Sequence, residues 1–129
     1  MDSITGLIPK DKFDTSKIES LSTIRIEAAE PILGALLEWM QDINWPAAQS
    51  LMDVLPRFHL GLVPHIQAVF RSNDDIWKCW VLLLLKKFPS ETVAMLSEDI
   101  KRIALLPTQA EVSEEADAYA QEVMVMFGL

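Results

Sequence analysis

The chain has 129 residues, of which 50% are hydrophobic and 23% charged, a balance typical of one globular domain and unlike that of a disordered chain. Its net charge of −8 makes nucleic acid an unfavourable partner, because binding to phosphates requires a surplus of Lys and Arg. We therefore expect a protein partner.

The single cysteine, Cys79, excludes an intrachain disulfide and fits a reducing compartment. The first residues lack the charged and apolar regions of a signal peptide. The longest apolar run extends from Trp80 to Leu85, far short of the roughly 20 residues needed to span a membrane. These features predict a cytoplasmic protein without a membrane partner.

The sequence predicts a single domain over residues 1–129. Its first part, residues 1–13, is expected to be an extended lead-in with a turn at Pro9. Asp14 is a candidate N-cap for a short helix through Leu21. A longer helix is expected from about residue 28 to 41, with Pro31 near its start. Its inward residues follow helical spacing: Ile32, Leu33, Leu36, Leu37 and Met40.

Two further helical stripes follow in the middle of the chain. Asn44 or Trp45 is expected to cap a helix that has Pro46 in its first turn and is closed or kinked by Pro56. Its predicted inward residues are Ala48, Leu51, Met52 and Leu55. Residues 62–72 repeat this pattern with Leu62, Val63, Ile66, Val69 and Phe70.

The next predicted helix is capped by Asn73 or Asp74 and runs to Phe88, where Pro89 stops it. Its sequence is apolar nearly all round, including Trp77, which predicts a central position covered on several sides.

The C-terminal third predicts two more helices. One begins at Ser90, ends at Pro107 and buries Val93, Leu96, Ile100 and Ile103. Thr108 and Glu111 have the spacing of a capping box for the last helix. Its expected inward residues are Val112, Ala116, Tyr119, Val123, Met126 and Phe127. No stretch alternates with period two, so the fold class is all-α.

One pattern is written twice, from Pro31 to Trp45 and from Pro64 to Trp77. The two copies are about 33 residues apart, a period typical of stacked helical repeats. With residues 90–129 as a third, atypical pair, the sequence predicts a right-handed α-α superhelix of about three HEAT-like helix pairs.

The blocks Asp42-Ile-Asn-Trp-Pro46 and Asp74-Asp-Ile-Trp-Lys-Cys-Trp80 carry a resemblance to a known family. The sequence resembles small bacterial HEAT-like proteins classed as a domain of unknown function. The similarity extends from about Leu7 through Glu111. It implies an α-α superhelix, and it implies no activity.

The candidate partner-binding residues are Trp39, Asp42, Asn44, Asp74, Asp75 and Lys78. If the two repeats stack in register, their inter-helix turns lie side by side on one edge. Helix capping explains Asn44 and Asp74 but not Asp42 or Asp75. Two interpretations therefore stay open: turn and capping chemistry alone, or an added recognition patch. Trp39 lies beside the apolar stripe, so we expect it to be partly exposed.

No catalytic, cofactor-binding or metal-ligating residue is predicted. His59 and His65 lack companions at metal-ligand spacing, and His65 is expected to be partly buried. No histidine is placed to activate Cys79, which favours an inert thiol. Glycine-rich phosphate loops and nucleophile elbows are absent from the sequence.

The first functional hypothesis is a non-enzymatic protein-protein interaction module, of inhibitory or immunity type, that binds a basic partner. The alternative is an enzyme that acts on nucleic acid, similar to HEAT-like alkylpurine DNA glycosylases. Those enzymes need a basic concave face with aromatic residues and a carboxylate. The sequence supplies aromatic residues and carboxylates without the basic surplus.

Overall fold

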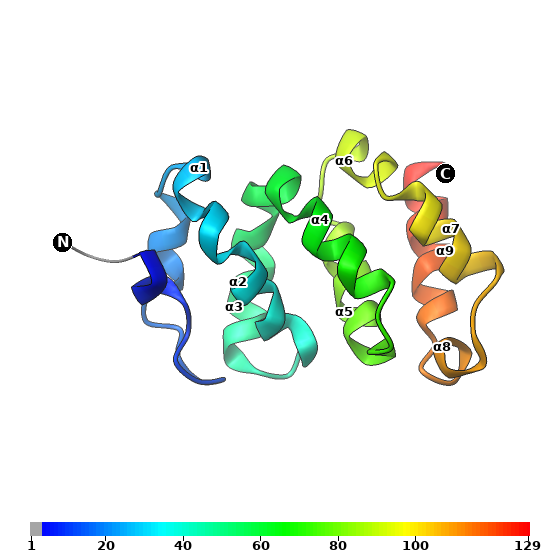
Figure 1. Cartoon of the computed structure of the whole chain (residues 1–129), viewed down its shortest axis with the longest axis horizontal. Coiled ribbons are helices and arrows are strands. Elements are labelled where there is room, and N and C mark those ends of the chain that lie inside the picture. Colours follow the sequence, from blue (N-terminus) through cyan, green and yellow to red (C-terminus); the bar gives the residue numbers. More distant parts are fainter. Residues whose placement is uncertain (1–3) are drawn as a thin grey trace. The chain divides into compact units, whose positions relative to one another are not determined.

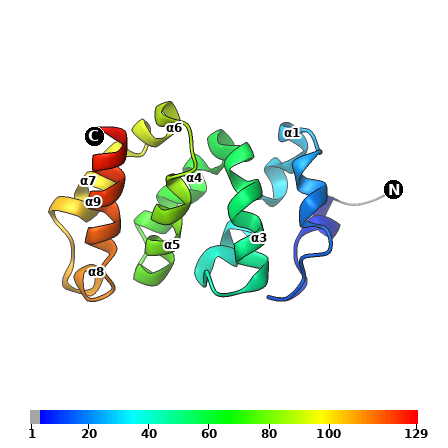
Figure 2. The ribbon, with the colours of Figure 1, turned by 180° about the vertical axis from the view of Figure 1, so that it is seen from behind.

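A computed structural model describes residues 4–129 (Figures 1 and 2). Over this range the chain forms helices, turns and loops without any strand, so the all-α prediction is confirmed. None of the helices in the same range is long and apolar enough to cross a membrane. The chain divides into two compact units, Met1–Leu62 and Val63–Leu129. The predicted superhelix concerns the relative placement of these units and stays a prediction.

The first unit is built from short helical segments in series. They are η1 (Ile4–Leu7), η2 (Ile18–Ser22), α1 (Ile26–Ala29), η3 (Glu30–Ile32), α2 (Leu33–Glu38), η4 (Trp39–Gln41), α3 (Pro46–Val54) and η5 (Leu55–Phe58), where η denotes a 3-10 helix. Helix α3 packs against η2, η4 and η5. Helix α4 (His59–Phe70) begins in this unit and ends in the second.

The predicted lead-in is not extended over its described part, because Ile4–Leu7 forms a 3-10 turn. Residues 1–3 of the predicted lead-in lie outside the described residues. Asp14 does not cap a helix either. Its carboxylate accepts hydrogen bonds from the Lys10 amide at 2.9 Å and from the amide and hydroxyl of Ser16. The Ser16 hydroxyl, followed by the two amides, lowers the pKa of Asp14.

The predicted helix over residues 28–41 is broken into four segments, α1 to η4. Pro31 has no N–H to donate and lies in the first turn of η3, where the backbone tightens to 3-10 geometry. The apolar stripe survives the break, and every predicted inward residue is buried: Ile32, Leu33, Leu36, Leu37 and Met40. Hydrophobic spacing therefore identified the core of this unit correctly although the helix is interrupted.

The second unit consists of the end of α4 and five further helices. These are α5 (Asp75–Leu85), α6 (Ser90–Ala94), α7 (Ser97–Leu105), α8 (Gln109–Ser113) and α9 (Ala116–Phe127). Helix α9 packs against α5 and α7, and it also contacts α6 and α8 (Figure 1). The last helix is therefore the central element of this unit.

Helix α5 is only partly the fully covered helix that its composition predicts. Its second half is buried at Val81, Leu82, Leu84 and Leu85. One side of its first turn lies at the surface, where Ile76 is 47% exposed and Trp77 is half-buried. The helix ends at Leu85, before the predicted Phe88.

The two C-terminal helices predicted from the sequence are each interrupted. A break separates α6 from α7, and another at Glu114 and Glu115 separates α8 from α9. Because the second break changes the phase between α8 and α9, a stripe counted through it misplaces Val112, whereas Met126 lies in the last turn of α9. Val112 and Met126, which were predicted to face inward, are 48% and 58% exposed.

The break before α9 depends on a left-handed backbone at Glu115, with φ of 64°. For a residue with a Cβ this conformation costs roughly 1–2 kcal/mol. Among the described residues other than glycine, Glu115 alone has a positive φ.

We expect Glu115→Gly to stabilise the protein by about 0.5–1 kcal/mol, because the relief of left-handed strain exceeds the added entropy of the unfolded chain. Glu114→Gly is the matched control, since it removes the same charge at a residue with φ of −94°. The control is expected to lose stability. Urea unfolding of both variants would measure the difference, and equal effects would contradict the strain argument.

Candidate functional site

Helix α5 begins at a carboxylate cap, as the sequence predicts. The Asp74 side chain accepts a hydrogen bond from the Trp77 amide at 3.0 Å, and the Asp74 amide donates to the Ser72 hydroxyl. This arrangement satisfies an amide in the first turn that has no partner within the helix. Asn73 precedes the cap and is exposed. Of the two predicted caps, the residue used is Asp74.

The next residue, Asp75, turns toward the interior rather than toward solvent. Its side chain is 12% exposed and accepts a hydrogen bond from Lys78 Nζ at 2.8 Å. Lys78 is itself buried, with a side chain 4% exposed. Two of the predicted partner-binding residues are therefore paired with each other inside the second unit.

The Lys78 ammonium also reaches Glu111, which is fully buried at the start of α8. Lys78 Nζ lies 2.9 Å from Glu111 Oε2. The Arg102 guanidinium binds both oxygens of the same carboxylate, at 2.7 and 2.6 Å. The Thr108 amide donates a further hydrogen bond at 2.8 Å, and Thr108 and Glu111 form the predicted capping box. We call Asp75, Lys78, Arg102 and Glu111 the ion-pair cluster.

The ion-pair cluster joins three helices and is electrically neutral. It connects the first turn of α5, the last turn of α7 and the first turn of α8. Burial alone would raise the pKa of Glu111, but Arg102, the Thr108 amide and Lys78 outweigh it and bring that pKa down to about 2. The Glu111 carboxylate likewise raises the pKa of Arg102. The Glu111 carboxylate and the Arg102 guanidinium are therefore charged near neutral pH.

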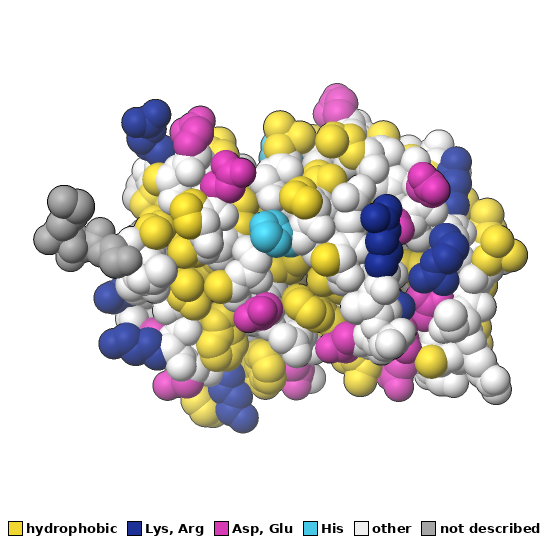
Figure 3. All heavy atoms as spheres, viewed as in Figure 1, with side chains coloured by type: hydrophobic (Ala, Val, Ile, Leu, Met, Phe, Trp, Pro, Cys, Tyr) yellow, Lys and Arg dark blue, Asp and Glu magenta, His cyan; other side chains and the backbone are white. Residues whose placement is uncertain are grey.

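Beside the ion-pair cluster, with which it shares Asp75, a depression opens to solvent where α5 begins. It is lined by Asn73, Asp74, Asp75, Ile76 and Glu114. We call these five residues the acidic depression. Figure 3 shows acidic side chains along this edge of the second unit, near the start of α5 and beside α8. The depression combines carboxylates with the exposed apolar side chain of Ile76.

Cys79 lies beneath this edge and is buried. Its Sγ is 3.2 Å from the Glu114 carbonyl and 3.3 Å from the Asp75 carbonyl, so the two carbonyls share the single S–H donor. Burial, followed by the neighbouring charges of Glu114, Asp75 and Glu115, raises the pKa of the thiol to about 11. A buried, protonated thiol is a poor nucleophile, as expected from the sequence.

The other predicted residues lie in the first unit, around the turn before α3. Asp42 accepts a hydrogen bond from the Asn44 amide at 2.9 Å, and the Asp42 carbonyl accepts one from the Trp45 amide. Asp42 thus forms a local turn of its own, which explains a carboxylate two residues before the expected cap. The N-cap position is occupied by Trp45 and not by Asn44, without a side-chain bond.

The indole rings beside this turn pack against each other. Trp39 and Trp45 meet edge to face, with ring centroids 5.7 Å apart. Trp39 is half-buried, in agreement with the partial exposure expected for it. Because Trp39, Asp42 and Asn44 belong to the first unit and the acidic depression to the second, the expected alignment of the two turns stays a prediction.

Sequence reasoning missed the roles of Glu111 and Arg102. The capping box identified Glu111 as a helix-start residue, and this local signal is correct. Its pairing with Lys78 joins positions 33 residues apart, so no local spacing indicates it. The pairing of Glu111 with Lys78 and Arg102 can be recognised only when the arrangement of the three helices is known.

Residues 7–124 match the family described as a domain of unknown function (DUF5071). The match covers most of the chain, and the chain belongs to this family. A search of curated proteins gave no match. The resemblance to a family of helical proteins of unknown function, expected from the sequence, is therefore confirmed.

We expect Lys78→Met to destabilise the protein by about 3–5 kcal/mol, because it leaves the largely buried Asp75 without its cation and the buried Glu111 with Arg102 alone. Lys86→Met is the matched control. Lys86 pairs with Glu122 at 2.8 Å, and both side chains are substantially exposed. The control should cost less than about 1 kcal/mol. Urea unfolding would measure both, and similar losses would contradict the structural role of the ion-pair cluster.

The low pKa of Glu111 predicts a defined acid sensitivity. Its folded-state value of about 2 lies below the ordinary value of 4.5, so its contribution is complete above about pH 4.5. The contribution is lost as the pH falls from 4.5 toward 2, and it amounts to about 3 kcal/mol at roughly 1.4 kcal/mol per pKa unit. Chemical unfolding from pH 6 to pH 2 would compare wild type with Glu111→Gln. The stability difference between the two proteins should shrink across this window, and a constant difference would contradict the prediction.

Proposed function

We propose that the protein is a non-enzymatic binding module whose acidic depression receives a basic, partly apolar segment of another protein. The observation that carries this proposal is the exposure of Ile76, at 47%, among the carboxylates of the depression. An apolar side chain there offers burial to a partner, and the surrounding acids favour a cationic one.

The charges around Ile76 support a cationic partner. Lys78, the nearest cation in α5, is buried and bound to Asp75 and Glu111. Asp74 uses one carboxylate oxygen for the Trp77 amide and remains exposed. Glu114 is also exposed. The surface of the depression is therefore negative while its interior is neutral, and the chain as a whole carries a net charge of −8.

The proposal includes the finer features expected from the sequence, a HEAT-like arrangement of helix pairs and a cytoplasmic location. The two copies of the repeated pattern fall in different compact units, which supports a repeat origin. The single cysteine is a buried free thiol, which suits a reducing compartment. An inhibitory or immunity-type role is consistent with a small acidic protein that binds a basic partner.

The test uses a synthetic peptide of Lys and Leu residues as the probe, and a Glu and Leu peptide of equal length as its counterpart. Wild type is expected to bind the basic peptide, more weakly as salt increases. The variant Asp74→Asn with Glu114→Gln removes two charges and keeps a good N-cap. It should bind about tenfold more weakly, since exposed charges contribute up to about 1 kcal/mol each.

The matched control is Glu91→Gln with Glu98→Gln, which removes the same charge from exposed residues near the starts of α6 and α7. Its affinity should remain close to that of wild type. Equal weakening in the two double variants would show that net charge alone attracts the peptide, and would contradict the proposed site. Salt-sensitive binding of duplex DNA in place of the peptide would support the nucleic-acid alternative.

A further inference from the structure

Helix α9 exposes one face that nothing in the second unit covers. Ala118, Gln121, Glu122, Val125 and Met126 recur at helical spacing and lie on the same side of the helix. Val125 is 84% exposed and Met126 58%. The opposite side is buried at Ala116, Ala120 and Val123. We call the exposed side, together with Lys86, the α9 face.

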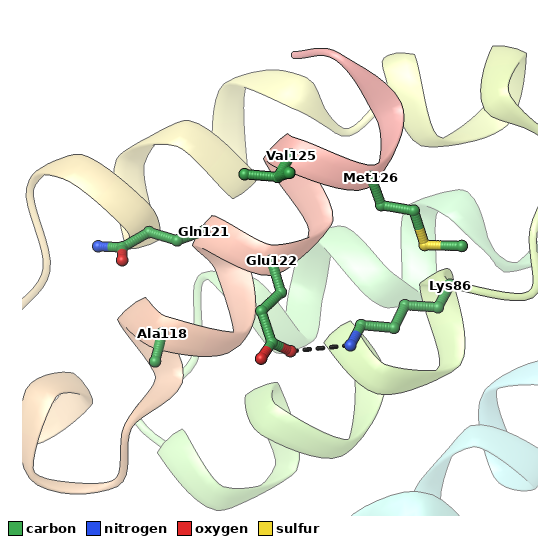
Figure 4. Close-up of a pocket in the computed structure, with 6 residues that line it drawn as sticks. All are labelled: Lys86, Ala118, Gln121, Glu122, Val125 and Met126. Atoms are coloured by element: carbon green, nitrogen blue, oxygen red, sulfur yellow. Dashed lines mark hydrogen bonds and ion pairs between the residues drawn. The ribbon is translucent and has the colours of Figure 1, made fainter.

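The α9 face is hollowed along the end of α5. Figure 4 shows Lys86 extending from α5 toward Glu122, while Val125 and Met126 lie one turn further along α9. The hollow has a volume of about 530 Å³. Its floor and rim are mainly apolar, and its two charges are joined by the 2.8 Å ion pair between Lys86 and Glu122.

The α9 face differs from the protein as a whole in its net charge. Two copies of a chain with a net charge of −8 repel each other overall. The α9 face carries one cation and one anion that neutralise each other, so two such faces meet without an excess of negative charge. A two-fold axis through the face would set Lys86 of one copy against a surface that carries Glu122 of the other. The face is therefore complementary to itself.

We propose that a second copy of this chain binds here, with the two α9 helices antiparallel across a two-fold axis. Val125 and Met126 of each copy enter the hollow beside Lys86 of the other. A 12-residue helix is only about 18 Å long. A standard stable interface needs about 20–30 residues on each side, so this dimer is weak, with a dissociation constant in the micromolar range or above.

Sedimentation equilibrium of the full chain, from about 10 μM to about 1 mM, tests the proposal because it covers weak dissociation constants. The average mass is expected to rise with concentration from 14.6 kDa toward twice that value. Val125→Glu places two like charges at the two-fold axis and should weaken dimerisation at least about tenfold. Leu60→Glu is the control, since Leu60 is 61% exposed and lies outside the α9 face.

Charge reversal distinguishes dimerisation through the α9 face from nonspecific self-association. Lys86→Glu alone adds a second acid beside Glu122 on both copies, and it should abolish dimerisation. Adding Glu122→Lys restores opposite charges at both positions, and dimerisation should return. A monomeric wild type throughout the concentration range, or equal weakening by Val125→Glu and Leu60→Glu, would overturn the proposal. Circular dichroism of each variant checks that the helices are intact.

Discussion

The second unit depends on a buried carboxylate with two cations. Glu111 is fully buried, and it is held by Lys78 from α5 and Arg102 from α7. A buried charge is costly unless its partners satisfy it, and here the capping amide of Thr108 completes the coordination. The relative placement of three helix ends is thus fixed by one acid, whose removal takes both carboxylate hydrogen bonds from Arg102 and leaves Lys78 with Asp75 alone.

This constraint also shapes the surface above it. Because Asp75 is directed inward to Lys78, the acids that remain at the start of α5 are Asp74 and, from the neighbouring α8, Glu114. Cys79 is covered by the same edge and held as a neutral thiol. The buried charges and the exposed acids are therefore adjacent but separate, and the first can be altered only with damage to the packing.

Periodicity predicted the buried residues better than it predicted the helices. The stripe around Pro31 is buried throughout, although the backbone is divided into several short segments. Burial depends on side-chain spacing, which a 3-10 turn changes little over three residues, whereas helix length depends on hydrogen bonds that proline removes. Where the phase itself shifts, at Glu115, the spacing argument also failed, because nothing in the sequence marks a left-handed acid.

The candidate site was predictable in part for the same reason. Asp74 as a cap and Thr108 with Glu111 as a capping box are local features, and both are present. Helix capping explains neither Asp42 nor Asp75, because the carboxylate of each binds a group other than a first-turn helix amide. Asp42 closes its own turn through Asn44, a local contact, while Asp75 depends on a lysine that is itself fixed by Glu111. Of these contacts, only the pairing of Lys78 with Glu111 requires tertiary structure.

The aromatic pairs bear on how the unfolding of each unit can be observed. Trp39 and Trp45 are stacked edge to face in the first unit, and Trp80 meets Tyr119 in the same way in the second. Two indoles with ring centroids 5.7 Å apart couple their strong ultraviolet transitions, and the resulting exciton circular dichroism disappears when the two rings separate. Both rings of this coupled pair belong to the first unit, so loss of the exciton band marks the unfolding of that unit.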